Sequence, residues 1–368
     1  MTRGIIVSVL AVFAGVAAAP AAELAELNAE AWVADIGGQI SRDSDGNIVS
    51  IDLTSAWVSD PDLEKLARMP HLRSINLSYT WVSDLGMEHL KPLQNVEELI
   101  LHYTEEITDG GIAHVKHWKK LTRLDARGTK VTSRVFELVG QIKTLEFLDV
   151  GFSRVTDDGF ENLADLTELK WLGFGGNKMS GVALPLLQLL PALAHLDMGG
   201  LQRTDSGRWG LALSDFNLES IEALTKLESL DLQDAKVTDL GLQRLSALAN
   251  LETLDLSRTP LTGRGIKALT SLPKLKSLKL WQCEQISDDI AEHLPALTRL
   301  EVLDLAETSV TAEVLEAAGR MPALKQLFVG GTKITSNAVE KFRTEHPAIR
   351  VTWWEAPPDP KPEKPDGT

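Results

Sequence analysis

The chain has 368 residues and a formal net charge of −15. This negative charge argues against nucleic acid and anionic membrane surfaces as binding partners. The sequence contains a single cysteine, so an intramolecular disulfide is excluded.

Residues 1–22 have the three parts of a secretory signal peptide. Arg3 supplies a positive charge, residues 4–16 are apolar, and residues 17–22 are small residues typical of a cleavage zone. The apolar run is too short and too rich in alanine to favour a membrane span, although an uncleaved anchor is the alternative. We therefore expect an exported protein, in the periplasm, at the cell surface or secreted, with no membrane insertion after signal cleavage.

Residues 23–47 are expected to form an N-terminal cap, made of a helix and a hairpin. Apolar residues at helical spacing between residues 24 and 32 predict the helix, and a glycine pair ends it. Residues 39–41 are then placed to pair with the next strand through the turn Asp45–Gly46. This cap would cover the open end of the array that follows.

Residues 48–348 repeat one unit of 24 or 25 residues about 12 times. Each unit, called a coil below, opens with the pattern L-x-x-L-x-L, whose alternation predicts a short strand. A pair such as Thr238–Asp239 follows and suits a helix N-terminus, because a side-chain oxygen there accepts a backbone N–H. Leucines at helical spacing complete the coil. The coils begin at Ile48, Leu72, Val96, Leu121, Leu145, Leu169, Leu193, Leu227, Leu251, Leu275, Leu300 and Leu324.

A single coil is not expected to fold alone. Its apolar anchors contribute about 1.5–3 kcal/mol each, whereas ordering its backbone costs about 1–2 kcal/mol per residue. Coils must therefore stack to share a core. The ninth position of most coils is a small polar side chain, such as Thr80 or Asn177, which we expect to bond the turn backbone of the next coil.

The pattern L-x-x-L-x-L-x-x-[T/N/C] with V-T-D-x-G-L resembles a leucine-rich repeat, and the coil with Cys283 is similar to the cysteine-containing subtype. The resemblance implies an α/β fold, a right-handed solenoid with a parallel sheet on the concave face and helices on the convex face. It also implies ligand recognition, usually of a protein, on the concave face. Many extracellular members from animals and plants carry disulfides at their ends, so the single cysteine favours a bacterial protein.

The third, fifth and seventh positions of each coil should point onto the concave face. The fifth position is mostly aspartate, which is either a general property of such repeats or a surface that selects basic partners or cations. Three successive coils have aromatic rings at the third position and glycine at the seventh, which predicts a trough with an aromatic wall and a floor without side chains. The expected partner-binding residues are Tyr79, His102, Tyr103, Arg123, Arg127, Phe147, Phe152, Trp171, His195, Arg208 and Trp209.

The coil that begins at Leu193 is ten residues longer than the others, with the insertion at about residues 201–210. A long loop in a regular array is a functional candidate, and it would overhang the concave face. The alternative is a neutral insertion, because surface loops tolerate added length.

Residues 349–355 predict a C-terminal cap strand, and residues 356–368 are rich in proline and charge, which predicts a disordered tail.

The sequence contains no motif for nucleophilic, metallopeptidase or phosphate-binding chemistry. His114 and His117 lie three residues apart, but a solvent-facing helix explains them better than a metal site. We therefore expect no cofactor, no metal and no enzymatic activity. The predicted function is recognition of a protein partner on the concave face, and the alternatives are a glycan-binding protein or a structural protein of the cell envelope.

Overall fold

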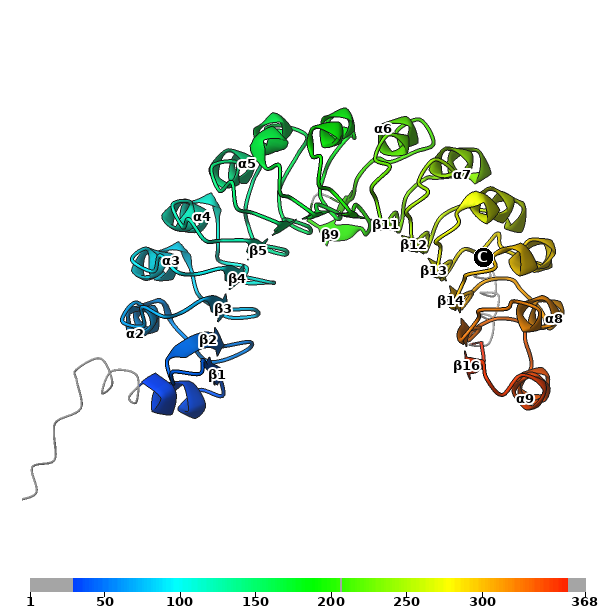
Figure 1. Ribbon diagram of the computed structural model, residues 1–368, viewed down its shortest axis with the longest axis horizontal. Coiled ribbons are helices and arrows are strands. Elements are labelled where there is room, and N and C mark those ends of the chain that lie inside the picture. The colour runs from blue at the N-terminus through cyan, green and yellow to red at the C-terminus, as the bar shows by residue number, and fades with distance from the viewer. Residues whose placement is uncertain (1–28, 206, 357–368) are drawn as a thin grey trace, which may run out of the picture.

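The computed structural model describes residues 29–205 and 207–356, so the expected signal peptide and nearly all of the expected tail lie outside the described residues. The described chain forms one arc of stacked coils, with strands along its inner side and helices along its outer side (Figure 1). This arrangement confirms the predicted α/β solenoid with a parallel sheet on the concave face.

The inner side of the arc carries a sheet of 14 strands within the described part of the chain. The first two strands are antiparallel, and all later neighbours are parallel. The register places equivalent residues side by side, so Leu230 lies between Leu196 and Leu254. The strands of this sheet are β1 (Gln39–Arg42), β2 (Ile48–Asp52), β3 (Ser74–Asn76), β4 (Glu98–Ile100), β5 (Arg123–Asp125), β6 (Phe147–Asp149), β7 (Trp171–Gly173), β8 (His195–Asp197), β11 (Ser229–Asp231), β12 (Thr253–Asp255), β13 (Ser277–Lys279), β14 (Val302–Asp304), β15 (Gln326–Phe328) and β16 (Arg350–Thr352).

The outer side is built from short helices, because the segment that connects one strand to the next within a coil is long enough for only about two helical turns. A further helical stretch, at residues 29–35, lies at the N-terminal end. The α-helices are α2 (Leu63–Leu66), α3 (Asp84–Leu90), α4 (Asp109–Val115), α5 (Arg134–Val139), α6 (Leu218–Glu222), α7 (Asp239–Leu245), α8 (Glu313–Gly319) and α9 (Ser336–Glu345). The 3-10 helices are η1 (Asp60–Asp62), η2 (Phe160–Asp165), η3 (Leu184–Leu189), η4 (Gly263–Ser271), η5 (Asp288–Glu292) and η6 (Leu294–Ala296). None of the helices in the described residues has both the length and the hydrophobicity that crossing a bilayer requires.

A ladder of hydrogen bonds joins the helix N-termini of consecutive coils. Asp239 accepts from the backbone N–H of Thr262 in the next coil at 2.9 Å and from its hydroxyl at 2.6 Å. The hydroxyl of Thr238 accepts from the Leu240 N–H at the start of α7, which is the helix cap that the sequence predicts. The same bonds to the following coil are made by Asp60, Asp84, Asp109, Asp157, Asp215 and Asp288.

The small polar residues at the ninth position are buried. Five of them donate to the sixth-position carbonyl of their own coil: Thr80, Thr129, Thr259, Thr308 and Thr332. Four others donate to that carbonyl of the preceding coil: Thr104, Ser153, Asn177 and Cys283. The hydroxyl of Thr104 donates to the carbonyl of Leu77 in the preceding coil at 2.7 Å. The Cys283 thiol likewise donates to the Leu256 carbonyl at 3.1 Å. These bonds run within a coil or back along the array, and not forward as expected, because a carbonyl has two lone pairs: the Leu77 carbonyl accepts from Thr80 of its own coil and from Thr104 of the following coil.

The residue at the eighth position of every coil has a left-handed backbone conformation, which turns the chain out of the strand. Side chains with a Cβ lose about 1–2 kcal/mol in this conformation, so glycine is the natural occupant. Three coils nevertheless place a large ring there, with φ between 51° and 56°. These residues are Tyr79, Tyr103 and Phe152. Five further coils also have a residue other than glycine there, so these three coils are distinguished by the size of the ring and not by the conformation.

The last coil is sealed by two tryptophans that follow β16. The indole N–H of Trp353 donates to the Ile334 carbonyl at 3.0 Å. The ring of Trp354 lies against Gly330 and Gly331, and a Cβ on Gly330 would overlap it. This second glycine pair therefore seats the end cap and belongs to no binding trough.

The replacement Asp239→Ala tests the ladder between helix N-termini. It removes the acceptor of two donors and leaves the half-buried Thr262 N–H without a partner. We expect the free energy of unfolding, measured by urea denaturation, to fall by about 1–3 kcal/mol.

The matched control is Asp165→Ala, which removes an exposed carboxylate whose partner is Lys143 at the surface. This control should change the free energy of unfolding by less than about 0.5 kcal/mol. Equal losses in the two variants would show that the ladder contributes nothing beyond an ordinary surface charge.

Candidate functional site

Five neighbouring strands of the concave face carry a row of side chains, named the concave ladder: Glu98, Arg123, Phe147, Trp171 and His195. The parallel register of β4 to β8 sets these third-position residues side by side. The Arg123 guanidinium lies 3.4 Å from the Phe147 ring centroid, and Arg123 Nε lies 3.1 Å from a Glu98 carboxylate oxygen. The Phe147 and Trp171 rings stack with centroids 4.1 Å apart and planes 14° apart. All five side chains are half-buried, so the ladder is fixed in shape and still reachable from solvent.

The seventh-position glycines do not leave the empty floor that the sequence suggests, because Arg127 lies across them. Its Nη1 reaches Asp149 in the next coil at 3.3 Å and Asp197, three coils along, at 2.9 Å. A Cβ on Gly151 would approach Arg127 Nη1 to 2.9 Å. On Gly175 a Cβ would overlap the carbonyl oxygen of Gly199. The glycines therefore make room for an ion-paired arginine and for close backbone packing, and the expected trough is filled at its centre.

The acidic column at the fifth position has a structural role in the strand ends. Asp149 Oδ1, for example, accepts from the Gly151 N–H at 2.7 Å, which fixes the turn that leaves β6. This bond to the residue two positions later recurs in eight coils, at Asp52, Asn76, Asp125, Asp149, Asp197, Asp231, Asp255 and Asp304. The column therefore follows from the geometry of the turn and does not by itself indicate a basic ligand.

Two carboxyls of this column have strongly perturbed acidity. Burial raises the pKa of Asp149 to about 7, although the Arg127 guanidinium opposes the shift. Burial also raises the pKa of Asp231 to about 7, and the neighbouring Asp255 carboxylate adds to the effect. Lys279 pairs with Asp255 at 3.1 Å and offsets only part of the rise for Asp231. Within residues 29–205 and 207–356, no three histidine, cysteine or acidic side chains gather so as to hold a metal ion.

A second aromatic group lies beyond the strand ends, on the edge of the solenoid. Tyr79 and Tyr103 stack with centroids 5.7 Å apart, and the His102 ring packs edge-on against both. Two further rings on this edge escaped the sequence analysis, Trp57 and Trp81, whose side chains are 86% and 74% exposed. Their signal is a tryptophan at the tenth position of two successive coils, a position that is polar or charged in all the coils that follow except the one with Pro260.

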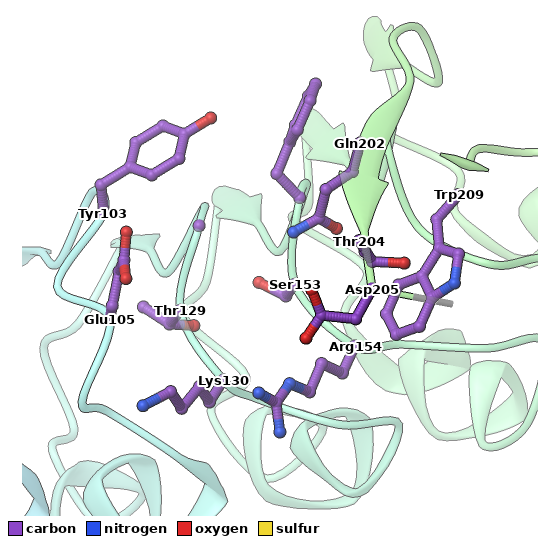
Figure 2. A pocket seen from close by; sticks show the side chains of 12 residues that line it. Tyr103, Glu105, Thr129, Lys130, Ser153, Arg154, Gln202, Thr204, Asp205 and Trp209 are labelled. Carbon is purple, nitrogen blue, oxygen red and sulfur yellow. The ribbon is translucent and has the colours of Figure 1, made fainter. Parts of the chain in front are cut away.

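The insertion forms an antiparallel hairpin outside the main sheet, made of β9 (Gln202–Thr204) and β10 (Gly207–Trp209). The hairpin faces the loops that follow β4, β5 and β6 across a cleft of about 450 Å³, named the edge cleft (Figure 2). The cleft brings Trp209 together with Tyr103 and Phe152. Arg208 is exposed on β10 and does not line the cleft.

The structure thus divides the expected single trough into separate parts. The concave ladder gathers Arg123, Phe147, Trp171 and His195. The edge gathers Tyr79, His102, Tyr103, Phe152 and Trp209. Arg127 lies between the two groups, with its guanidinium carbon 4.5 Å from the Phe152 ring centroid.

Comparisons with known proteins concern the repeat and the fold. The family model described as Leucine Rich repeat matches residues 68–91, 223–246 and 247–269. No curated protein sequence matches the chain. The family matches and the structure show that the fold is a leucine-rich-repeat solenoid, as the sequence pattern predicts.

Three solved structures illustrate the likeness in fold. An internalin from Listeria monocytogenes has a TM-score of 0.58 and 18% identity, over 89% of this chain and 94% of the internalin. A leucine-rich-repeat protein from Leptospira interrogans has a TM-score of 0.52 and 19% identity, over 78% of this chain and 74% of that protein. A TDR receptor has a TM-score of 0.52 and 17% identity, over 83% of this chain and 55% of the receptor.

The raised pKa of Asp231 gives a pH-dependent prediction. A carboxyl whose pKa is higher in the folded than in the unfolded chain stabilises the fold at low pH, and this stability is lost as the pH rises toward 7. Asp231→Asn should therefore match the wild type at pH 4 and exceed its free energy of unfolding at pH 8 by at least about 1 kcal/mol. Asparagine retains an oxygen that accepts from the Gln233 N–H.

Urea denaturation at the two pH values measures this difference. Asp52→Asn is the matched control, because it makes the same substitution at the fifth position of the first coil. If Asp231→Asn were no more stable than the wild type at pH 8, the Asp231 carboxylate would ionise in the fold without a penalty.

Proposed function

We propose that this protein is a non-enzymatic binding module that recognises a protein partner with the concave ladder. The observation that carries the proposal is the prior assembly of the ladder, in which Arg123 is held between Glu98 and the Phe147 ring. Side chains that are already fixed lose little conformational entropy when a partner binds. Tryptophan and arginine are also the residue types that most often dominate the binding energy of protein interfaces.

The dimensions of the ladder suit a macromolecular partner. It crosses five parallel strands, and strands lie about 4.8 Å apart, so it extends for roughly 20 Å across the concave face. It is open along this length and has polar groups at both ends, Glu98 at one and His195 at the other. His195 Nε2 lies 4.0 Å from a Glu228 carboxylate oxygen. An aromatic centre with a polar rim is the usual composition of a protein interface.

Two further observations support this function. The similar solved structures include an internalin and a receptor, and a leucine-rich-repeat solenoid of this class fits a protein-binding module. The concave carboxyl with a raised pKa that lies nearest the ladder, Asp149, is bonded to Arg127 and to the Gly151 N–H. It therefore has a structural role, which argues against its use as a catalytic acid.

Export of the protein is part of the same proposal. It rests on residues 1–22, whose charge, apolar run and small residues follow the order of a secretory signal peptide. The partner is then a protein of the periplasm, the cell surface or the surrounding medium.

The proposed interface is tested by the double replacement Phe147→Ala and Trp171→Ala. The first step captures partners with the wild-type protein and quantifies them by mass spectrometry, and the second measures the affinity of the purified partner by calorimetry. Loss of two central aromatic side chains should weaken binding by about a hundredfold or more, because each such side chain contributes about 2 kcal/mol at an interface centre.

Phe216→Ala is the control for this experiment, since it removes an exposed ring on the outer side of the solenoid, 80% exposed. It should leave the affinity unchanged. Equal recovery of every partner by the wild type and the double variant would exclude the concave ladder as the interface.

A further inference from the structure

The edge cleft is a built feature of the fold and not the by-product of a loose loop. The hairpin pairs Gln202 with Trp209 at its base, and the Thr204 hydroxyl donates to the Gly207 carbonyl at 2.9 Å. The chain rejoins the array directly afterwards, where the Ala212 N–H donates to the Met179 carbonyl at 2.9 Å. The wall that carries Trp209 is therefore fixed at both ends to the stacked coils.

The wall of the cleft opposite Trp209 carries two aromatic residues whose backbone conformation is unfavourable for residues with a Cβ. Tyr103 and Phe152 hold the left-handed eighth position, where glycine would be favoured. The eighth positions that follow them are glycines, and the rings lie directly against these: Tyr103 against Gly128, and Phe152 against Gly176. A side chain at Gly128, which itself lines the cleft, would overlap the Tyr103 ring and fill the space beside it.

The polar groups of the cleft are balanced in charge. Glu105 and Asp205 supply carboxylates, whereas Arg154 and Lys130 supply cations, and Lys130 pairs with Glu106 at 2.7 Å. Figure 2 shows these side chains arranged around the same opening as the ring of Trp209. A charged ligand would meet a group of its own sign here. A neutral ligand with many hydroxyl groups would find both donors and acceptors, because each hydroxyl does both.

One buried atom in the cleft wall lacks a hydrogen-bond partner. The Gln202 side chain extends from β9 into the region of the cleft (Figure 2), and its Oε1 is buried without a donor among the described residues. Buried polar atoms in folded proteins nearly always have a partner, so an orphan acceptor in a cleft wall points to a ligand that supplies donors.

The aromatic surface continues from the cleft along the same edge. A smaller hollow of about 240 Å³ shares Tyr103 and Glu105 with the cleft and is lined on its other side by Tyr79 and Trp81. Trp57 follows one coil further on, at the position equivalent to Trp81. Coils repeat at about 4.8 Å along the sheet, which is close to the length of one pyranose unit in an extended glycan. Exposed rings at this repeat suit the apolar C–H faces of successive sugars.

We propose that the solenoid edge from the cleft to Trp57 binds a neutral, linear oligosaccharide, independently of the concave ladder. Tyr103, Phe152 and Trp209 would enclose the sugar in the cleft, with Gln202 and Asp205 hydrogen-bonding its hydroxyls. Trp81 and Trp57 would stack on the sugars that follow.

The test is an array of linear oligosaccharides that holds neutral and acidic glycans, probed with the full chain. Calorimetry then measures the affinity of the best neutral glycan for the wild type and for Trp209→Ala and Trp81→Ala. Each replacement should weaken binding by about tenfold, since each removes one stacking ring. Trp81 is exposed and Trp209 lies on the hairpin, outside the repeat core, and circular dichroism confirms that both variants are folded.

Two control variants locate the site. Phe216→Ala removes an exposed ring on the outer side, and Trp171→Ala removes a ring of the concave ladder; neither should change the affinity for the glycan. Binding of acidic glycans only, or of no glycan, would overturn the proposal. So would a glycan affinity that depends on Trp171 and not on Trp209. If Trp209→Ala instead weakens binding of the purified protein partner, and no neutral glycan binds, the cleft belongs to the protein interface.

Discussion

Each coil buries its leucines only against the coils on either side, and the hydrogen bonds that hold the array run mainly between coils. Asp239 bonds Thr262 of the next coil, and Thr104 bonds Leu77 of the preceding one. Burial between coils constrains the residue types of the core, and these bonds constrain those of many helix N-termini and ninth positions. The third, eighth and tenth positions are free of this constraint, and these are the positions at which the ladder and the edge are built.

The fold could be predicted from the sequence because the residue patterns that specify it repeat at a regular interval. The leucines of L-x-x-L-x-L and the Thr–Asp pair recur at a fixed spacing, so a reading of one coil applies to the rest. The concave ladder could also be predicted from the sequence, because third-position residues of neighbouring parallel strands must lie side by side. Phe147, Trp171 and His195 therefore lie together as the register requires.

The remaining features depend on single side chains and not on periodicity. Arg127 crosses two coils to reach Asp197, and no spacing rule reveals the reach of one arginine over glycines. Trp57 and Trp81 lie at the tenth position of their coils, which holds no aromatic residue in the following coils, so no repeating pattern marks them. The insertion could be located because its coil is longer than the others. Its hairpin could not be predicted, because strands of three residues are too short to show an alternation of polar and apolar residues.

Arg127 also has a mechanical consequence. A solenoid deforms like a spring, through small changes of angle at each joint between neighbouring repeats. The ion pairs of Arg127 bridge three consecutive joints, from the coil of β5 to the coil of β8, so these joints open only if a bond to Asp149 or Asp197 is stretched. We therefore expect the arc to resist bending most at the stretch that displays the Phe147–Trp171 stack, and to bend more readily in the two arms.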